Sequence, residues 1–118
     1  INMDGVIIVS TPQEIALQDV KRGIRMFDKL KVNIIGLIDN MSYFIGDDGK
    51  KYSIFGEGGV KKTAEEFKKD FLGEIPIDPK VGQQGDLGEP IVEKDQNHQI
   101  SKVYLNFAKI IKDKFLKL

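Results

Sequence analysis

Three short apolar runs, separated by amphipathic stretches, constrain the fold of this chain most strongly. The runs are Val6–Ser10, Val32–Ile38 and Phe71–Ile75. Short continuous apolar runs are typical of strands that are buried on both faces of a parallel sheet. Because such strands alternate here with amphipathic helical patterns, we expect an α/β fold in three layers, a parallel sheet flanked by helices on both sides.

Amphipathic periodicity predicts the helices that cover this sheet. Thr11 is expected to cap the first helix, with Pro12 at its first position and Glu14 at its third, which together form a capping box. Its buried face is expected to carry Ala16, Val20, Ile24, Phe27 and Leu30. The helices are predicted over residues 12–31, Val60–Lys69 and Ile100–Leu118.

The remaining segments are predicted to be mostly irregular. Tyr43–Gly59 is expected to be a loop or a small hairpin that turns at Gly46-Asp47-Asp48-Gly49, because glycine and aspartate favour turns. Pro79–Gly88 is polar and glycine-rich, and we expect at most one helical turn there. Glu89–Asn97 is predicted to be a loop.

The segment Gly56–Thr63 comes close to a phosphate-binding loop but does not match it. That motif reads G-x-x-x-x-G-K-[ST], and Lys61 stands here where the second glycine belongs. The glycine allows the backbone to curl so that its N–H groups face a phosphate, and a lysine side chain obstructs this. We therefore interpret the segment as the glycine-rich start of a helix.

Two loops are predicted to follow strands at the carboxyl edge of the sheet, where open α/β sheets bind ligands. Asp39-Asn40-Met41-Ser42 follows the second strand, and an asparagine side chain can read the edge of a purine ring. The alternative is a turn capped by Asp39 or Asn40. Glu74–Pro79 follows the third strand and could contact a flat ring, or Pro76 could simply end the strand.

Composition excludes several kinds of chemistry. Eighteen basic residues balance eighteen acidic ones, so no electrostatic argument favours nucleic acid. The chain has no cysteine, which excludes disulfides, thiolate zinc sites and thiol nucleophiles and suits a reducing cytoplasm. His98 is the single histidine, and we expect no metal site and no catalytic residue. The apolar runs are too short to span a bilayer.

The chain opens on Ile1 and enters an apolar strand by Val6. Natural domains rarely begin so close to a core strand, so we expect a piece of a longer protein. A sheet of three strands is also small for this fold class. We expect its exposed strand edge to favour a dimer or a larger assembly.

Five segments together resemble the Mrp/ApbC proteins, relatives of MinD among the deviant-Walker P-loop ATPases. The resemblance covers nearly the whole chain in order, which identifies residues 1–118 as the C-terminal half of a MinD/Mrp-like P-loop NTPase domain. The N-terminal half, with the phosphate loop and the magnesium-binding aspartates, is expected to be absent. The segments are Asp4–Glu14, Asp39–Phe44, Phe55–Gly59, Phe71–Pro79 and Gly88–Val92.

The resemblance implies a function and a set of site residues. Members are cytoplasmic ATPases that bind ATP with magnesium, form homodimers and carry iron–sulfur clusters to apoprotein targets. We expect the full-length protein to hydrolyse ATP slowly and this chain alone to be inactive. The matching positions are Asn40 for reading the adenine, Pro76, Ile77 and Asp78 for lining the base, and Thr11, Pro12 and Gln13 for a loop near the nucleotide and the dimer partner.

Two further hypotheses stay open, and the first of them follows from a departure from the family. Many members carry Cys-Pro-x-Cys after the Met-Ser-Tyr-Phe segment, and two subunits hold one cluster through those thiolates. Here the positions read Gly46-Asp47-Asp48-Gly49, and carboxylates are poor ligands for such a cluster. The first alternative is a MinD/ParA-like positioning or scaffold ATPase that binds no cluster. The second is a stand-alone α/β interaction module.

Overall fold

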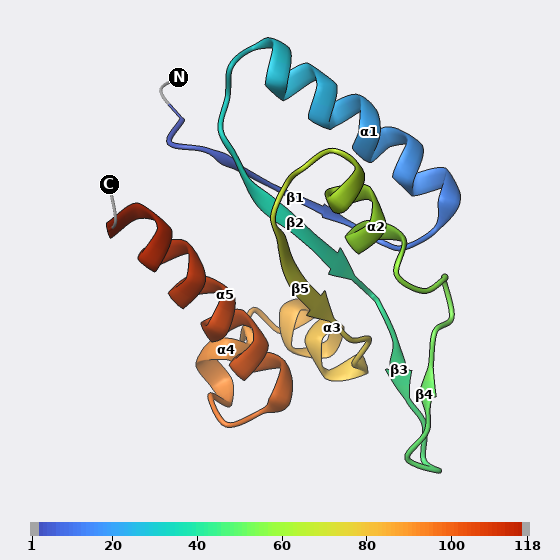
Figure 1. Cartoon of the computed structure of the whole chain (residues 1–118). Coiled ribbons are helices and arrows are strands. Elements are labelled where there is room, and N and C mark those ends of the chain that lie inside the picture. Colours follow the sequence, from blue (N-terminus) through green and yellow to red (C-terminus); the bar gives the residue numbers. More distant parts are fainter. Residues whose placement is uncertain (1–2, 117–118) are drawn as a thin grey trace.

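A three-stranded parallel sheet forms the centre of the chain in the computed structural model, which describes residues 3–116 (Figure 1). The strands β1 (Val6–Ser10), β2 (Ile34–Asn40) and β5 (Phe71–Ile75) lie in the order β1-β2-β5. Both pairings are parallel, as predicted. Strands β1 and β5 have the predicted bounds, whereas β2 begins and ends later than predicted, so that Asp39 and Asn40 belong to the strand itself.

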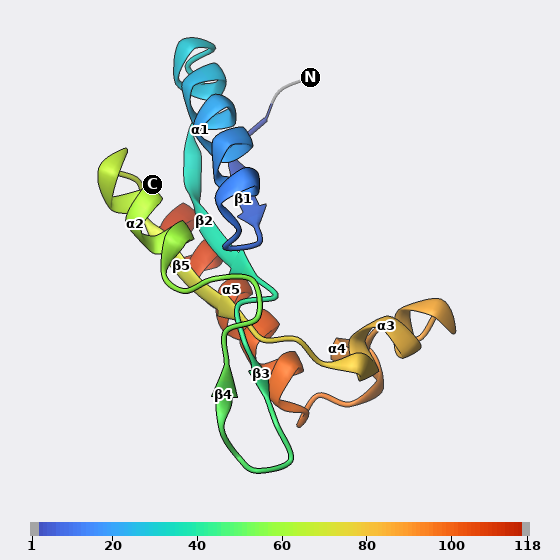
Figure 2. The same cartoon turned by 90° about the vertical axis from the view of Figure 1, so that its right-hand side faces the viewer.

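Helices cover both faces of the sheet, which confirms the three-layer prediction. Helices α1 (Glu14–Lys29) and α2 (Gly59–Glu66) cover one face, and α5 (Gln99–Leu116) covers the other (Figures 1 and 2). The predicted last two residues of α5 lie outside the described range. The first core consists of Leu17, Val20, Ile24, Leu37, Val60 and Ala64, and the second of Ile38, Ile75 and Phe107.

The first turn of α1 differs from the prediction. The helix begins at Glu14 with Gln13 as its N-cap residue, and the Thr11 hydroxyl donates to Gln13 Oε1 over 3.2 Å. The predicted capping box is therefore wrong. The buried face is also shifted, because Leu17 is buried instead of Ala16 and Leu30 is 64% exposed.

The segments between and after the strands contain more regular structure than predicted. The hairpin of β3 (Phe44–Ile45) and β4 (Lys51–Tyr52) is confirmed and projects beyond the sheet in Figure 2. The polar stretch after β5 is a helix of eight residues, α3 (Pro79–Asp86), and not one turn. A four-residue helix, α4 (Ile91–Lys94), interrupts the predicted loop. No helix within residues 3–116 has both the length and the apolar character that crossing a membrane requires.

The molecule is elongated for its size. Its radius of gyration is 15.3 Å, whereas a compact domain of this length has about 13.5 Å. Strand β1 forms one edge of the sheet, and Val9 on it is 53% exposed. Pairing of this edge with another chain stays a prediction.

Replacing Gly73 by alanine should destabilise the chain by about 2 kcal/mol, because two costs add. Gly73 lies in β5 with φ +145°, and a Cβ there would lie 2.9 Å from Phe107 Cε1 in α5. Gly82→Ala in α3 is the matched control, since no heavy atom lies within 4 Å of its Cβ position. Urea unfolding compares the two variants, and equal stability would contradict the tight packing of α5 on β5.

Candidate functional site

The segments that follow β2 and β5 lie side by side at the carboxyl edge of the sheet. Asn40, the last residue of β2, is in register with Ile75, the last residue of β5. Beyond them, the Ser42 N–H donates to the Ile75 carbonyl over 3.0 Å, and the Ile77 N–H donates to the Tyr43 carbonyl over 2.7 Å. These bonds continue the pairing past the sheet, so Asn40 lies beside the start of the 76–78 loop.

Met41 turns the chain immediately after Asn40. Its φ is +53°, in the left-handed region that residues other than glycine seldom adopt, and its side chain is 45% exposed. Such conformations cost about 1–3 kcal/mol and cluster at functional sites. The turn ends β2 at Asn40 and directs the chain into the hairpin.

The 76–78 loop lines a cavity of about 330 Å³. The predicted residues Pro76, Ile77 and Asp78 form one wall, and the hairpin and the start of α5 form the others. This volume lies at the lower end of the usual range for small-molecule pockets. The remaining lining residues are Phe44, Ile45, Asp47, Pro79, Gln99 and Ile100.

Asn40 lies on the same face of the sheet as α5. Side chains alternate along a strand, and Ile38, two residues earlier, belongs to the core under α5. Its strand partner Ile75 directly precedes the 76–78 loop, although neither Asn40 nor Ile75 is part of the cavity lining. The structure thus brings four of the seven predicted residues into one neighbourhood.

The other three predicted residues, Thr11, Pro12 and Gln13, lie in the loop after β1 and pack elsewhere. A Cβ on Gly56 would lie 2.9 Å from the Pro12 carbonyl oxygen, and one on Gly59 would lie 3.1 Å from it. This loop therefore packs against the glycine-rich segment before α2 and does not line the 76–78 cavity.

The Gly56–Thr63 segment is the start of a helix, as interpreted from the sequence. Helix α2 begins at Gly59, and its N-cap residue Gly58 has φ +72°. The Thr63 hydroxyl donates to the Gly59 carbonyl over 2.8 Å and is buried. It is thus occupied within the helix and is not presented to a magnesium ion or a phosphate.

Asp39 carries a buried carboxyl group. From the sequence, this residue was expected only as the cap of a turn. It is 1% exposed, and its carboxylate oxygens accept no hydrogen bond from the described residues 3–116. Burial raises the pKa of Asp39 to about 6, and the nearby Glu74 carboxylate adds to the rise. The nearby Ser42 side chain and the charge of Lys51 lower the pKa of Asp39 in part, although the Ser42 hydroxyl does not reach the carboxylate with hydrogen-bond geometry. The sequence signal for this buried carboxyl group was an acidic residue directly after an apolar run.

The carboxylate of Asp48 stabilises the turn at the tip of the hairpin. Asp48 accepts hydrogen bonds from the Tyr52 hydroxyl and from the Lys50 N–H, and the Tyr52 bond is the main reason that the pKa of Asp48 is lowered. Within the described part of the chain, no group of three or more histidine, cysteine or acidic residues could hold a metal ion.

One protein family matches the chain over most of its length. The model described as ParA, the NUBPL iron-transfer P-loop NTPases, matches residues 1–112. The chain belongs to this family. The resemblance to the Mrp/ApbC proteins is confirmed.

Known proteins support the same assignment. An iron-sulfur cluster carrier protein of Aquifex aeolicus is 41% identical over 94% of this chain and 31% of its own length. A nucleotide-binding protein of Archaeoglobus fulgidus, solved in complex with ADP, superposes with a TM-score of 0.67 at 34% identity, covering 82% of this chain and 39% of that one. The cell division protein MinD of Aquifex aeolicus shares the fold, with a TM-score of 0.69 at 23% identity over 93% of this chain and 44% of MinD. The chain spans about a third of the length of the curated relatives that it matches.

Proposed function

We propose that this chain is the base-binding part of a nucleotide-dependent iron–sulfur cluster carrier. In this proposal residues 1–118 are the C-terminal half of the P-loop NTPase domain, and the phosphate loop and the magnesium ligands come from the N-terminal half. The full-length protein binds ATP with magnesium, hydrolyses it slowly, acts as a homodimer and delivers clusters to apoproteins.

The observation that carries the proposal is the junction of the two loops at the carboxyl edge. Backbone hydrogen bonds between Ser42 and Ile75 and between Ile77 and Tyr43 keep the segment that follows Asn40 beside the 76–78 loop, which lines the cavity. Asparagine offers donors and an acceptor to a purine edge, and the loop offers a flat apolar wall to its ring. The relatives that are named as iron–sulfur cluster carriers support the other part of the proposal, which is the transport of a cluster.

A second function is favoured by the hairpin. The positions of the family's thiolates read Gly46–Gly49 here, Asp48 is bonded to Tyr52 and Lys50, and the chain has no cysteine. A scaffold or positioning ATPase without a cluster would need none of those ligands.

Reconstitution of the full-length protein with iron and sulfide separates the two functions. We expect, for the carrier, a cluster held by thiolates outside residues 1–118, with visible absorption that titrates to one cluster per dimer. Asp48→Ala should leave the cluster yield unchanged, because carboxylates are poor cluster ligands. A full-length protein that incorporates no stable cluster would favour the scaffold ATPase.

Nucleotide hydrolysis provides a further prediction. The full-length protein should hydrolyse ATP slowly with magnesium, whereas the 118-residue chain should show no activity above background, since Gly56–Thr63 begins a helix and is not a phosphate loop. Lys62→Ala should leave the activity of the full-length protein within about twofold of wild type. Hydrolysis by the 118-residue chain that Lys62→Ala abolishes would contradict the proposal.

A further inference from the structure

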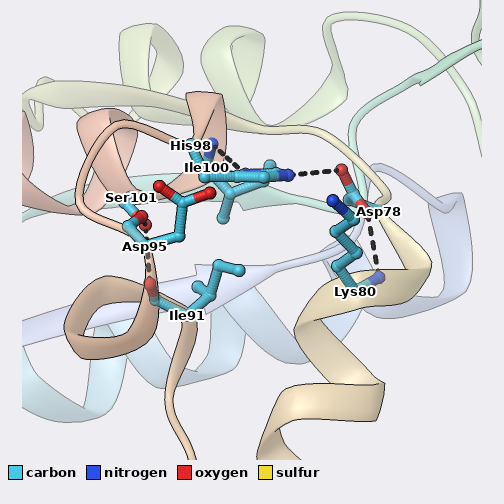
Figure 3. Close-up of polar contacts among 7 residues, drawn as sticks. All are labelled: Asp78, Lys80, Ile91, Asp95, His98, Ile100 and Ser101. Carbon is cyan, nitrogen blue, oxygen red and sulfur yellow. Dashed lines mark hydrogen bonds and ion pairs between the residues drawn. The ribbon is translucent and has the colours of Figure 1, made fainter.

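His98 links the start of α5 to the loop that lines the cavity (Figure 3). Its Nε2 lies 3.3 Å from Asp78 Oδ2, and its Nδ1 accepts a hydrogen bond from the Ile100 N–H over 3.1 Å. The His98 side chain is 15% exposed and that of Asp78 is 29% exposed. The imidazole therefore bridges the two segments in a largely buried place.

These contacts determine which ring nitrogen carries the proton. A nitrogen that accepts from a backbone N–H carries no proton, so Nδ1 is the unprotonated nitrogen and Nε2 is the donor. The protonated Nε2 therefore faces the Asp78 carboxylate at 3.3 Å, and a contact between an N–H group and an ionised acceptor is stronger than one with a neutral acceptor. One side chain both caps α5 and restrains Asp78.

Both ends of this bridge are anchored. Asp78 Oδ1 accepts from the Lys80 N–H over 2.9 Å and so caps α3. On the other side, the hydroxyl of Ser101, which is fully buried, lies within hydrogen-bond distance of the Ile91 and Asp95 carbonyls, at 2.9 and 2.6 Å. The first turn of α5 is therefore held to α4, and Figure 3 shows His98 extending from it toward Asp78.

We propose that His98 is a positioning residue for nucleotide binding, which acts by holding Asp78 and the 76–78 loop against the base. This inference rests on the proposed function of the loop. His98 lies outside every segment that carried the resemblance, and its role follows from the geometry alone. The loop residues contact the base, and His98 restricts the loop to the conformation that forms the cavity wall.

Two variants of the full-length protein separate the bridge from the helix cap. His98→Asn keeps a good N-cap acceptor for the Ile100 N–H, but its side chain is too short to reach Asp78. His98→Ala removes both interactions. We expect His98→Asn to bind ADP about tenfold more weakly, because the contact of Nε2 with the Asp78 carboxylate is lost, with a melting temperature close to wild type. His98→Ala should lose both affinity and stability.

Inorganic tripolyphosphate provides the internal control, because it occupies the phosphate side without a base. Its affinity should be the same in wild type and in His98→Asn. Equal ADP affinity in wild type and His98→Asn would overturn the positioning role and leave the proposed function intact. A wild-type protein that binds neither ADP nor tripolyphosphate would overturn both.

The protonated nitrogen can be tested without nucleotide in the 118-residue chain, which has a single histidine. Nitrogen-15 NMR of its imidazole at neutral pH should show a protonated Nε2 and an unprotonated Nδ1. The opposite tautomer, or rapid averaging between the two as in a free histidine, would overturn the bridge.

Discussion

The Asp39→Asn variant is expected to be about 3 kcal/mol more stable than the wild-type chain at pH 8 and nearly equal to it at pH 4. Asp39 is 1% exposed and its carboxylate oxygens have no hydrogen-bond partner among residues 3–116. Burial raises the pKa of Asp39 from the model-compound value of 3.8 to about 6. The ionised form therefore destabilises the folded state, and asparagine removes that charge with little change of shape.

The sign of this effect follows from proton binding. The folded chain binds the Asp39 proton more tightly than the unfolded chain does, so its stabilisation is complete below pH 3.8 and is lost as the pH rises through about 6. Urea unfolding from pH 4 to pH 8 measures the difference. Asp19→Asn is the control, because that side chain is 79% exposed. A constant difference between Asp39→Asn and wild type across this range would contradict the unpartnered, buried state of the carboxyl group.

The Asn40→Ala variant of the full-length protein should bind ATP about 10- to 100-fold more weakly than wild type. The amide of Asn40 is the group that we propose to read the adenine, and its loss leaves the base's polar edge unpaired. The preference for ATP over GTP should shrink as well, since a site that reads no purine edge discriminates poorly. Isothermal titration with the two nucleotides measures both effects.

A residue at the other end of the same strand provides the control for Asn40. Asn33 precedes β2 and is exposed, and its backbone carbonyl accepts a hydrogen bond from the Val6 N–H, an interaction that the alanine variant keeps. Asn33→Ala should bind ATP like wild type. A loss of affinity in Asn33→Ala that matches the loss in Asn40→Ala would show a general effect of substitution and no role in reading the base.

The sequence predicted the layers better than the segments between them. Strands β1 and β5 have the predicted bounds because each apolar run is flanked by glycine, a polar residue or proline. Strand β2 extends through Asp39 and Asn40, since pairing with Ser10 on one side and with Glu74 and Ile75 on the other keeps these polar residues in the sheet. Tertiary pairing thus overrode the local preference of aspartate and asparagine for turns.

The local sequence also predicted the wrong N-cap residue for α1, and it did not indicate the full length of α3. Thr11 has the right chemistry for an N-cap, but the close contact of Pro12 with Gly56 and Gly59 places the helix start at Glu14. Helix α3 contains two glycines and no buried residue, so neither propensity nor periodicity indicated it. The side-chain cap from Asp78 supports its first turn instead.

The candidate site was predictable only where a motif and a strand end coincided. Asn40 and Pro76–Asp78 were predicted from the family motifs, and the structure pairs Asn40 with Ile75, the residue before the 76–78 loop. The His98–Asp78 bridge spans 20 positions of sequence, and its formation depends on how α5 packs against β5. Such contacts leave no local pattern, so they could be found only in the folded chain.

Photoaffinity labelling of the full-length protein with 8-azido-ATP tests the central claim most directly, because the azide reacts beside the base. Trypsin releases the peptides 32–50, which contains Asn40, 52–61, which contains Gly56, and 70–80, which contains Pro76, Ile77 and Asp78. Labelling that ATP competes away is predicted on peptides 32–50 and 70–80. Competed labelling that spares both peptides would contradict the assignment of this chain as the base-binding part of the site.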